Sequence, residues 1–382
     1  MEYRKLGARG PEVSVIGYGC AGLTDKTEAQ VCAALHSAMD RGVNFLDLFS
    51  SDPVLRANIG AAIAGHRNRI VIQGHIGSAW VDGQYLRTRD LALTKQAFED
   101  QLRLLGTDRL DVGMIHYVDG AADWKEIVEG PFMEYVQELR RQGRIGCVGL
   151  GSHNPDVAIT AVESGLIDVL MFAVNPCYDM QPGDEDLEKL WADESYAHAL
   201  HNQDAARTRL YELCAARGVG IDVMKAFGGG DLLDAELSPF GKAFTPVQCL
   251  HYALTRPAVA SVMCGCKTEE ELAAVLAYET ATDSQRDYSG VLSGLDRFTF
   301  EGHCLYCGHC APCPVGIDVA AVTRYLNLCR AQGGVPESER GHYDLLAHHG
   351  GECIQCGACE SRCPFGVGIR ANMAAAAEMF GK

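Results

Sequence analysis

Eight short apolar runs, each followed by a segment with helical periodicity, divide most of this chain. The runs are VSVIG, NFLD, IVIQ, RLDVGMIH, IGCVGL, DVLMFAV, GIDVM and VASVM, which begin at residues 13, 44, 70, 109, 145, 168, 220 and 259. Each is rich in Val and Ile and apolar on both faces, as is typical of buried parallel strands. The repeat predicts a (β/α)8 barrel. A doubly wound open sheet is the alternative, although no GxGxxG motif follows the first run.

Local signals place helices between these runs. Apolar residues at helical spacing extend from Val31 to Met39 and end before Gly42, a residue type favoured just after a helix. Three pairs have the signatures of helix N-termini, namely Asn154-Pro155, Thr245-Pro246 and Thr268 with Glu271.

Two segments lie outside the repeat. Residues 178–207 form an acidic insertion after the sixth run, which we interpret as either a lid over the barrel mouth or a solvated loop. Residues 281–300 have weak periodicity and predict a linker, after which the composition changes. We therefore expect a barrel over residues 1–280 and a second domain over residues 301–382.

The second domain contains eight of the 17 cysteines, arranged in two runs. CIQCGACESRCP has the C-x2-C-x2-C-x3-C-P spacing of bacterial ferredoxins, and CLYCGHCAPCP is one residue shorter before its last cysteine. In such a pair, the fourth cysteine of each run binds the other cluster. The sequence predicts two 4Fe-4S clusters, one held by Cys304, Cys307, Cys310 and Cys363, the other by Cys353, Cys356, Cys359 and Cys313. Two structural zinc sites are the alternative.

Composition restricts partners and compartment. Lys and Arg number 33 against 50 Asp and Glu, and the net charge of −17 argues against nucleic acid or an anionic membrane as partner. We find no membrane-length apolar run and no signal-peptide core. Clustered cysteines in such a chain indicate metal rather than disulfides. We expect a cytoplasmic protein with oxygen-sensitive clusters.

Several barrel segments carry recognisable motifs. They are YRKLGARGPEVSVIGYG, NFLD, RLDVGMIH, IGCVGLGSHN and DVMKAFGGG. With the cysteine tail, they resemble an aldo-keto reductase that carries a C-terminal ferredoxin-type domain. That family reduces carbonyls with NAD(P)H, using an Asp, a Tyr, a Lys and a His. Asp47 and His116 match the Asp and the His, but Asp52 stands where the Tyr is expected and His75 where the Lys is expected. Residues 44–84 contain no Tyr and no Lys.

The resemblance also implies a nicotinamide site. Gly151 and Ser152 lie where the wider superfamily binds the nicotinamide amide, and Asn175 matches the family's Asn after the sixth strand. Gly265 precedes a capped helix whose N-terminus would meet the phosphates, and Lys267 would meet a 2′-phosphate. NAD(P) is therefore an expected cofactor.

The predicted acid–base residues allow several chemistries on a small-molecule substrate. In the redox interpretation, a histidine protonates the substrate while electrons come from NAD(P)H or the clusters. A ferredoxin or flavoprotein partner is then expected, because clusters transfer single electrons. The alternatives are a non-redox lyase or isomerase with structural clusters, a metal bound by both histidines and a carboxylate, and polar residues that only hydrogen-bond each other. His75 is a cation only when protonated, so we expect activity to fall as pH rises.

Overall fold

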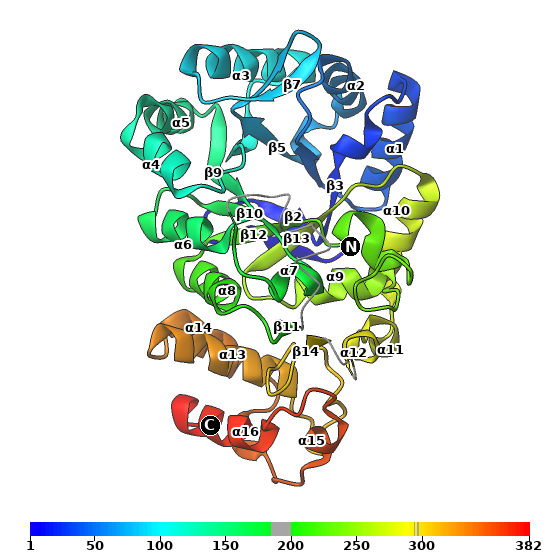
Figure 1. The fold of residues 1–382 in the computed structure, drawn as a ribbon, viewed down its shortest axis with the longest axis vertical. Helices are drawn as coiled ribbons and strands as arrows, with labels where there is room; N and C mark the ends of the chain where they lie inside the picture. Colours follow the sequence, from blue (N-terminus) through cyan, green and yellow to red (C-terminus); the bar gives the residue numbers. More distant parts are fainter. Residues whose placement is uncertain (185–199, 294, 296–297) are drawn as a thin grey trace.

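The computed structural model describes residues 1–184, 200–293, 295 and 298–382. Its central feature is a closed barrel of eight parallel strands in the order β10-β12-β13-β3-β4-β5-β8-β9 (Figure 1). The strands are β3 (Ile16–Gly19), β4 (Phe45–Leu48), β5 (Val71–Ile76), β8 (Leu110–Ile115), β9 (Ile145–Ser152), β10 (Val169–Ala173), β12 (Gly220–Met224) and β13 (Val259–Cys264). Each predicted run overlaps one of these strands, so the (β/α)8 barrel is confirmed.

Helices connect successive strands and surround the barrel. They are α1 (Glu28–Asp40), α2 (Pro53–Ile63), α3 (Leu91–Leu105), α4 (Ala121–Glu129), α5 (Pro131–Arg141), α6 (Pro155–Ser164), α7 (Pro176–Asp179), α8 (Ala205–Arg217), α9 (Pro246–Leu254) and α10 (Glu269–Leu276). The apolar stripe predicted between Val31 and Met39 is the buried face of α1.

The predicted N-caps are present on α6, α9 and α10, where they are Asn154, Thr245 and Thr268. Thr268 accepts a hydrogen bond from the Glu271 N–H at 3.2 Å. The Glu271 carboxylate does not complete the expected capping box, because it accepts from the backbone N–H of Lys267 at 2.6 Å.

An apolar core fills the barrel interior on the side away from its mouth. The N-terminal hairpin of β1 (Tyr3–Lys5) and β2 (Glu12–Ser14) contributes Leu6 and Val13 to this core. Gly220 is required where the hairpin meets β12, because a Cβ atom there would lie 2.3 Å from the Gly7 nitrogen. We therefore expect the active site at the opposite end of the barrel, where the carboxyl-terminal ends of the strands lie.

The chain after α10 continues into a largely helical tail. Its helices are α11 (Asp283–Arg286), α12 (Ser289–Leu292), α13 (Val319–Gln332), α14 (Glu337–Asp344), α15 (Ala358–Arg362) and α16 (Ile369–Phe380). Figure 1 shows α13 to α16 at one end of the molecule, and α13 packs against α8 and α16. No helix among the described residues is long and apolar enough to span a membrane.

Half of the acidic insertion predicted at residues 178–207, namely residues 185–199, lies outside the described residues. Of its described part, β11 (Leu200–His201) pairs in parallel with β14 (Phe298–Thr299), near the start of the tail. The choice between a lid and a solvated loop therefore stays a prediction.

A buried arginine joins the barrel to the tail. Arg256, which follows α9, donates to the backbone oxygen of Leu305 inside the first cysteine run, and Tyr288 donates to the same oxygen at 2.7 Å. The guanidinium of Arg256 lies 4.4 Å from the ring centre of Tyr252 and 5.4 Å from that of Tyr306. These contacts fix the first cysteine run against the barrel wall.

Candidate active site

A cavity of about 520 Å³ opens at the carboxyl-terminal mouth of the barrel. All eight strands, or the residues that directly follow them, contribute to its wall. The lining residues are Gly19, Ala21, Asp47, Phe49, His75, Tyr85, His116, Tyr117, Gly151, His153, Met171, Met224, Lys225, Met263 and Gly265. This is the end of the barrel where barrel enzymes build their active sites.

Four of these side chains form a continuous chain of hydrogen bonds. Tyr85 Oη lies 2.5 Å from His116 Nε2, and His116 Nδ1 lies 2.8 Å from His75 Nδ1. His75 Nε2 lies 3.1 Å from Asp47 Oδ1. The structure thus brings three predicted residues together, Asp47, His75 and His116, because β4, β5 and β8 are neighbouring strands.

Tyr85 reaches this group from a hairpin that the sequence analysis did not include. The hairpin follows β5 and consists of β6 (Ser78–Val81) and β7 (Gln84–Arg87). Asp82 and Gly83 form its turn, and both have positive φ. A two-residue Asp-Gly turn between extended segments is a strong hairpin signal, so SAWVDGQYLR contained the information needed to find it.

Phe49 and two arginines hold the hairpin in place. The Phe49 ring stacks on Tyr85, with ring centres 5.7 Å apart. Arg87 and Arg89 both form ion pairs with Asp123 on α4, and Arg89 also donates to the His116 backbone oxygen at 2.8 Å. Burial raises the pKa of the Tyr85 hydroxyl, so Tyr85 is protonated and able to donate at neutral pH.

Asp123→Ala should lower turnover by roughly 10- to 100-fold, because a loosened hairpin moves the Tyr85 hydroxyl away from His116. Steady-state kinetics should show the loss in kcat. Glu126→Ala, on the exposed side of the same helix, is the control and should leave kcat unchanged. Equal kcat values for both variants would mean that Asp123 does not hold Tyr85.

The structure leaves Asp52 outside the group of acid–base residues. Its carboxylate is the N-cap of α2 and accepts from the backbone N–H groups of Val54 and Leu55, at 2.8 and 3.4 Å. Pro53 starts the helix directly after Asp52, so the side chain turns to the helix N-terminus instead of the cavity.

The hydrogen bonds of the two histidines contradict the predicted two-histidine metal site. A metal ion needs ligand lone pairs that point to one position, but the His75 ring faces His116 with one nitrogen and Asp47 with the other. In the described part of the chain, no three His, Cys, Asp or Glu side chains are arranged to hold a single metal ion.

The sequence analysis did not identify two further polar residues of the cavity wall, His153 and Lys225. His153 lies at the end of β9 and shares a 3.0 Å hydrogen bond with Asp119. Burial lowers the pKa of His153, while Asp119 opposes this shift. Lys225 follows β12 with a positive φ, and burial lowers its pKa to about 8. Lys225 therefore places an amino group in the cavity wall.

A groove leads from this cavity toward α10. A neighbouring cavity of about 370 Å³ shares Lys225, Met263 and Gly265 with the first one and reaches Lys267 and Glu271. Gly265 thus lies where the two cavities join, whereas Lys267 lines the second cavity only. Of the other predicted nicotinamide residues, Gly151 lines the first cavity. Ser152 is buried and donates to the Val118 backbone oxygen at 2.8 Å, away from it.

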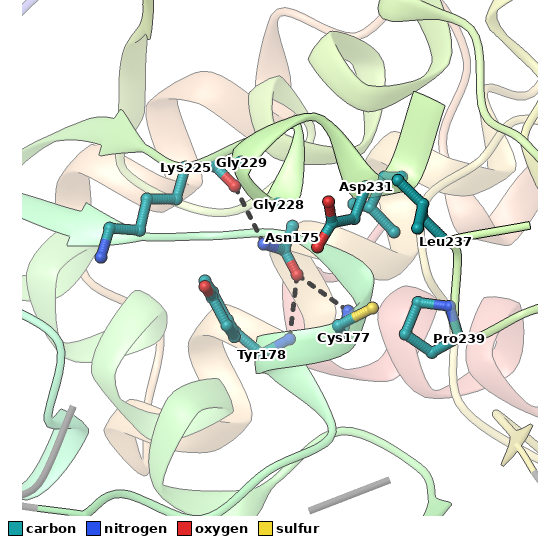
Figure 2. Close-up of a pocket in the computed structure, with 10 residues that line it drawn as sticks. Asn175, Cys177, Tyr178, Lys225, Gly228, Gly229, Asp231, Leu237 and Pro239 are labelled. Carbon is teal, nitrogen blue, oxygen red and sulfur yellow. Dashed lines mark hydrogen bonds between the residues drawn. The ribbon is translucent and has the colours of Figure 1, made fainter. Parts of the chain in front are cut away.

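A third cavity of about 300 Å³ contains Asn175 (Figure 2). Asn175 donates to the Lys225 backbone oxygen at 2.9 Å and accepts from the N–H groups of Cys177 and Tyr178, as Figure 2 shows. Its side chain therefore joins the ends of β10 and β12 next to Lys225, which lines all three cavities.

The cysteines of the tail form two groups. Burial raises the pKa of Cys304 and Cys310 to about 12 and of Cys307 to about 11, and neighbouring thiols, including Cys363, add to each rise. A separate small cavity is lined by Cys313, Cys353, Cys356 and Cys359. The fourth cysteine of each run thus lies with the first three of the other run.

The two runs also share one backbone conformation. The second residue after the first cysteine has a positive φ in both, 59° at Tyr306 and 58° at Gln355. The glycine after the second cysteine repeats this, with 81° at Gly308 and 75° at Gly357. Non-glycine residues adopt this conformation where their surroundings require it, often at ligand sites.

Comparison with known proteins identifies the barrel. Residues 15–291 match the sequence pattern of the Aldo/keto reductase family. The chain is 29% identical over 289 residues to the uncharacterized oxidoreductase YqkF of Bacillus subtilis, covering 71% of this chain and 89% of that protein. It is 24% identical over 164 residues to the aldo-keto reductase YhdN of B. subtilis, covering 40% of this chain and 47% of that protein.

Solved structures of low sequence identity share the fold. The aldo-keto reductase AKR11C1 from Bacillus halodurans, in its holo form, matches 75% of this chain and 94% of its own with a TM-score of 0.59 and 22% identity. The putative aldo-keto reductase PA4992 from Pseudomonas aeruginosa matches 72% and 93% with a TM-score of 0.54 and 24% identity. The family pattern covers most of the chain and the barrel agrees with it, so this protein belongs to the aldo/keto reductase family.

Proposed function

We propose that the chain is an oxidoreductase that reduces the carbonyl group of an apolar small molecule with NAD(P)H, and that Tyr85 donates the proton. The unbroken hydrogen-bond chain from Tyr85 through His116 and His75 to Asp47 carries this proposal. Asp47 and His116 match the Asp and the His with which the family reduces carbonyls. Tyr85 and His75 take over the tyrosine and cation roles from other places in the sequence.

Reduction begins with His75 protonated beside the Asp47 carboxylate. As the carbonyl carbon accepts hydride, the carbonyl oxygen takes the proton of Tyr85. Tyr85 then takes the Nε2 proton of His116, and His116 Nδ1 takes the Nδ1 proton of His75. Both histidines end neutral, and His75 Nε2–H still donates to Asp47. One proton and one hydride have reached the product, so charge balances.

The transfer requires a neutral His116, because this ring must accept at one nitrogen while it donates at the other. Burial and the neighbouring His75 lower the pKa of His116 well below its usual range. At neutral pH His116 therefore stays uncharged, and the proposed transfer starts from a proton on His75 Nδ1, which faces His116 Nδ1.

The groove suits a dinucleotide with phosphates. Its first part opens into the cavity beside His116, its middle carries the cation of Lys225, and its end meets the N-terminus of α10. A helix N-terminus and a cation both favour phosphate groups. A nicotinamide cofactor bound there would supply the hydride.

Lys267→Ala should weaken binding of NADPH more than of NADH, by about two- to fivefold, since Lys267 is solvent-exposed and three glutamates follow in the first turn of α10. Titration by fluorescence at two salt concentrations measures both affinities. Lys125→Ala on α4 is a remote control. An equal loss for both cofactors would show that Lys267 does not contact a 2′-phosphate.

Apolar side chains form much of the cavity wall and indicate the substrate class. Phe49, Tyr117, Met171, Met224 and Met263 surround the space in front of Tyr85 and His116. Aromatic and thioether groups bind apolar and aromatic surfaces through dispersion and desolvation. We therefore propose aromatic or branched aliphatic aldehydes and ketones as substrates.

The test uses anaerobically purified protein with NADH or NADPH and a panel of such carbonyls. Oxidation of the cofactor with stoichiometric formation of the alcohol supports the proposal. Turnover of an unsaturated or hydroxylated substrate without any change in the nicotinamide would instead support the lyase or isomerase alternative. The oxidoreductase names of the relatives favour the redox reaction.

We further propose that residues 301–382 are a ferredoxin-type domain with two 4Fe-4S clusters. Three neighbouring thiols with raised pKa values, Cys304, Cys307 and Cys310, cannot all ionise unless positive charge lies among them, and iron provides it. A cluster separates its four ligands by its own width, so these sulfurs need not meet around one ion. When bound, the clusters would transfer single electrons, which makes a ferredoxin or flavoprotein the expected partner.

A further inference from the structure

A second carboxylic acid lies in the barrel interior behind the hydrogen-bond chain. The amide nitrogen of Gln73 on β5 donates to Asp47 Oδ1 at 3.0 Å and to Asp222 Oδ2 on β12 at 2.9 Å. Gln73 and Asp222 have no exposed surface, and neither lines the cavity. The amide therefore joins a carboxylate of the proposed active site to a carboxyl group without access to solvent.

Two oxygen atoms of this pair have no hydrogen-bond partner among the described residues, Gln73 Oε1 and Asp222 Oδ1. Buried polar atoms nearly always have a hydrogen-bond partner, so the lack of a partner at each of these oxygens needs an explanation. Both atoms are acceptors while Asp222 is ionised, and they belong to two side chains that one hydrogen bond already joins. A proton on Asp222 Oδ1 that is donated to Gln73 Oε1 would give both atoms a partner.

Turning the Gln73 amide around does not solve the problem. Oε1 would then lie where Nε2 is now, 3.0 Å from Asp47 Oδ1 and 2.9 Å from Asp222 Oδ2. Three acceptor oxygens would face one another unless both carboxyl groups were protonated. The orientation with Nε2 between the two carboxyl groups needs only one proton.

We propose that Asp222 is a neutral carboxylic acid in the native protein. Its hydroxyl donates to Gln73 Oε1 while Gln73 Nε2 donates back to Asp222 Oδ2, which closes a ring of two hydrogen bonds between acid and amide. The ring fixes the amide, so its second N–H points at Asp47. Asp222 is thus a positioning residue that acts on Asp47 through Gln73.

The electrostatics agree with this assignment. Burial raises the pKa of Asp222 well above its usual range, and the charge of Asp47 adds to the rise, against hydrogen bonds from Gln73 and from the Asp222 backbone. An ionised Asp222 would be a second buried negative charge close to Asp47, with no cation beside it among its described contacts. A neutral Asp222 leaves Asp47 as the ionised partner for protonated His75.

Infrared difference spectroscopy tests the protonation state without reference to activity. The spectrum of the full-length protein minus that of Asp222→Asn at neutral pH should contain the C=O band of a protonated carboxyl group, shifted in deuterated water. Asp100→Asn, which removes an exposed carboxylate on α3, is the control and should show only carboxylate bands. Carboxylate bands alone for Asp222→Asn would overturn the proposal.

Kinetics test the positioning role, which rests on the proposed carbonyl reduction. Asp222→Leu should lower kcat by roughly tenfold with little change in KM, because Gln73 loses its anchor and Asp47 its fixed donor. Asp222→Asn should restore kcat, since its amide can both donate to and accept from Gln73. If Asn is as inactive as Leu, an ionised Asp222 is required and the proposal fails. If the unaltered protein reduces no carbonyl, the proposed function fails, and the infrared band alone decides the state of Asp222.

Discussion

Tyr85→Phe should lower the kcat of carbonyl reduction by roughly 10²- to 10⁴-fold, the usual contribution of a positioned proton donor. The substitution removes one oxygen atom and keeps the ring that stacks on Phe49, so the hairpin and the KM should change little. His116→Ala and His75→Ala should cause losses of similar size, because each interrupts the same proton transfer.

Tyr135→Phe on α5 is the matched control. It removes a hydroxyl of similar burial that lies outside the cavity wall, and it should leave kcat unchanged. Full activity of Tyr85→Phe would mean that the proton comes from another donor in the wall, with Tyr117 the next to replace. The single-turnover rate of hydride transfer is the appropriate measurement, because it excludes product release.

The direction of the pH dependence follows from the proton transfers. Reduction consumes one proton from the hydrogen-bond chain, so its rate should fall as rising pH removes that proton. Oxidation of the alcohol runs the same steps backward from neutral histidines, so its rate should rise over the same range. Opposite slopes for the two directions would be hard to obtain from a lysine–tyrosine pair, which titrates at higher pH.

The barrel could be predicted because buried parallel strands are visible as short apolar runs. The meeting of Asp47, His75 and His116 then followed from strand order, since β4, β5 and β8 are consecutive around the barrel. Asp52 was placed wrongly because counting residues from Asp47 ignored the helix that Pro53 begins. Local capping chemistry determined the direction of that side chain.

Tyr85 and Asp222 could not be assigned in the same way. Tyr85 enters the site because a hairpin folds back over the mouth, and a search for a tyrosine within residues 44–84 stopped one residue before it. Asp222 lies on a strand across the barrel from Gln73, so their contact depends on barrel closure and on side-chain direction. The sequence thus displays the turn of the hairpin but neither its position over the barrel mouth nor the contact between Asp222 and Gln73.

Serine substitutions in the cysteine runs should produce the second large effect. We expect about eight iron atoms per chain in anaerobically purified protein, and loss of one whole cluster signal in each single variant. The grouping of Cys304 with Cys363, and of Cys353 with Cys313, determines which variants should resemble each other. Iron content and electron paramagnetic resonance of the reduced protein measure both quantities.

Crossed ligation makes a specific prediction about pairs. Cys304→Ser and Cys363→Ser should share one altered spectrum, and Cys353→Ser and Cys313→Ser should share the other, although the two members of each pair lie in different runs. Ligation within runs would instead pair Cys304→Ser with Cys313→Ser.

The control is Cys329→Ser, which replaces a buried cysteine of α13 outside the runs and should retain both signals. Two zinc ions with no iron would contradict the clusters themselves. Because Arg256 and Tyr288 hold Leu305 beside Cys304, the first pair should also disturb the contact between tail and barrel.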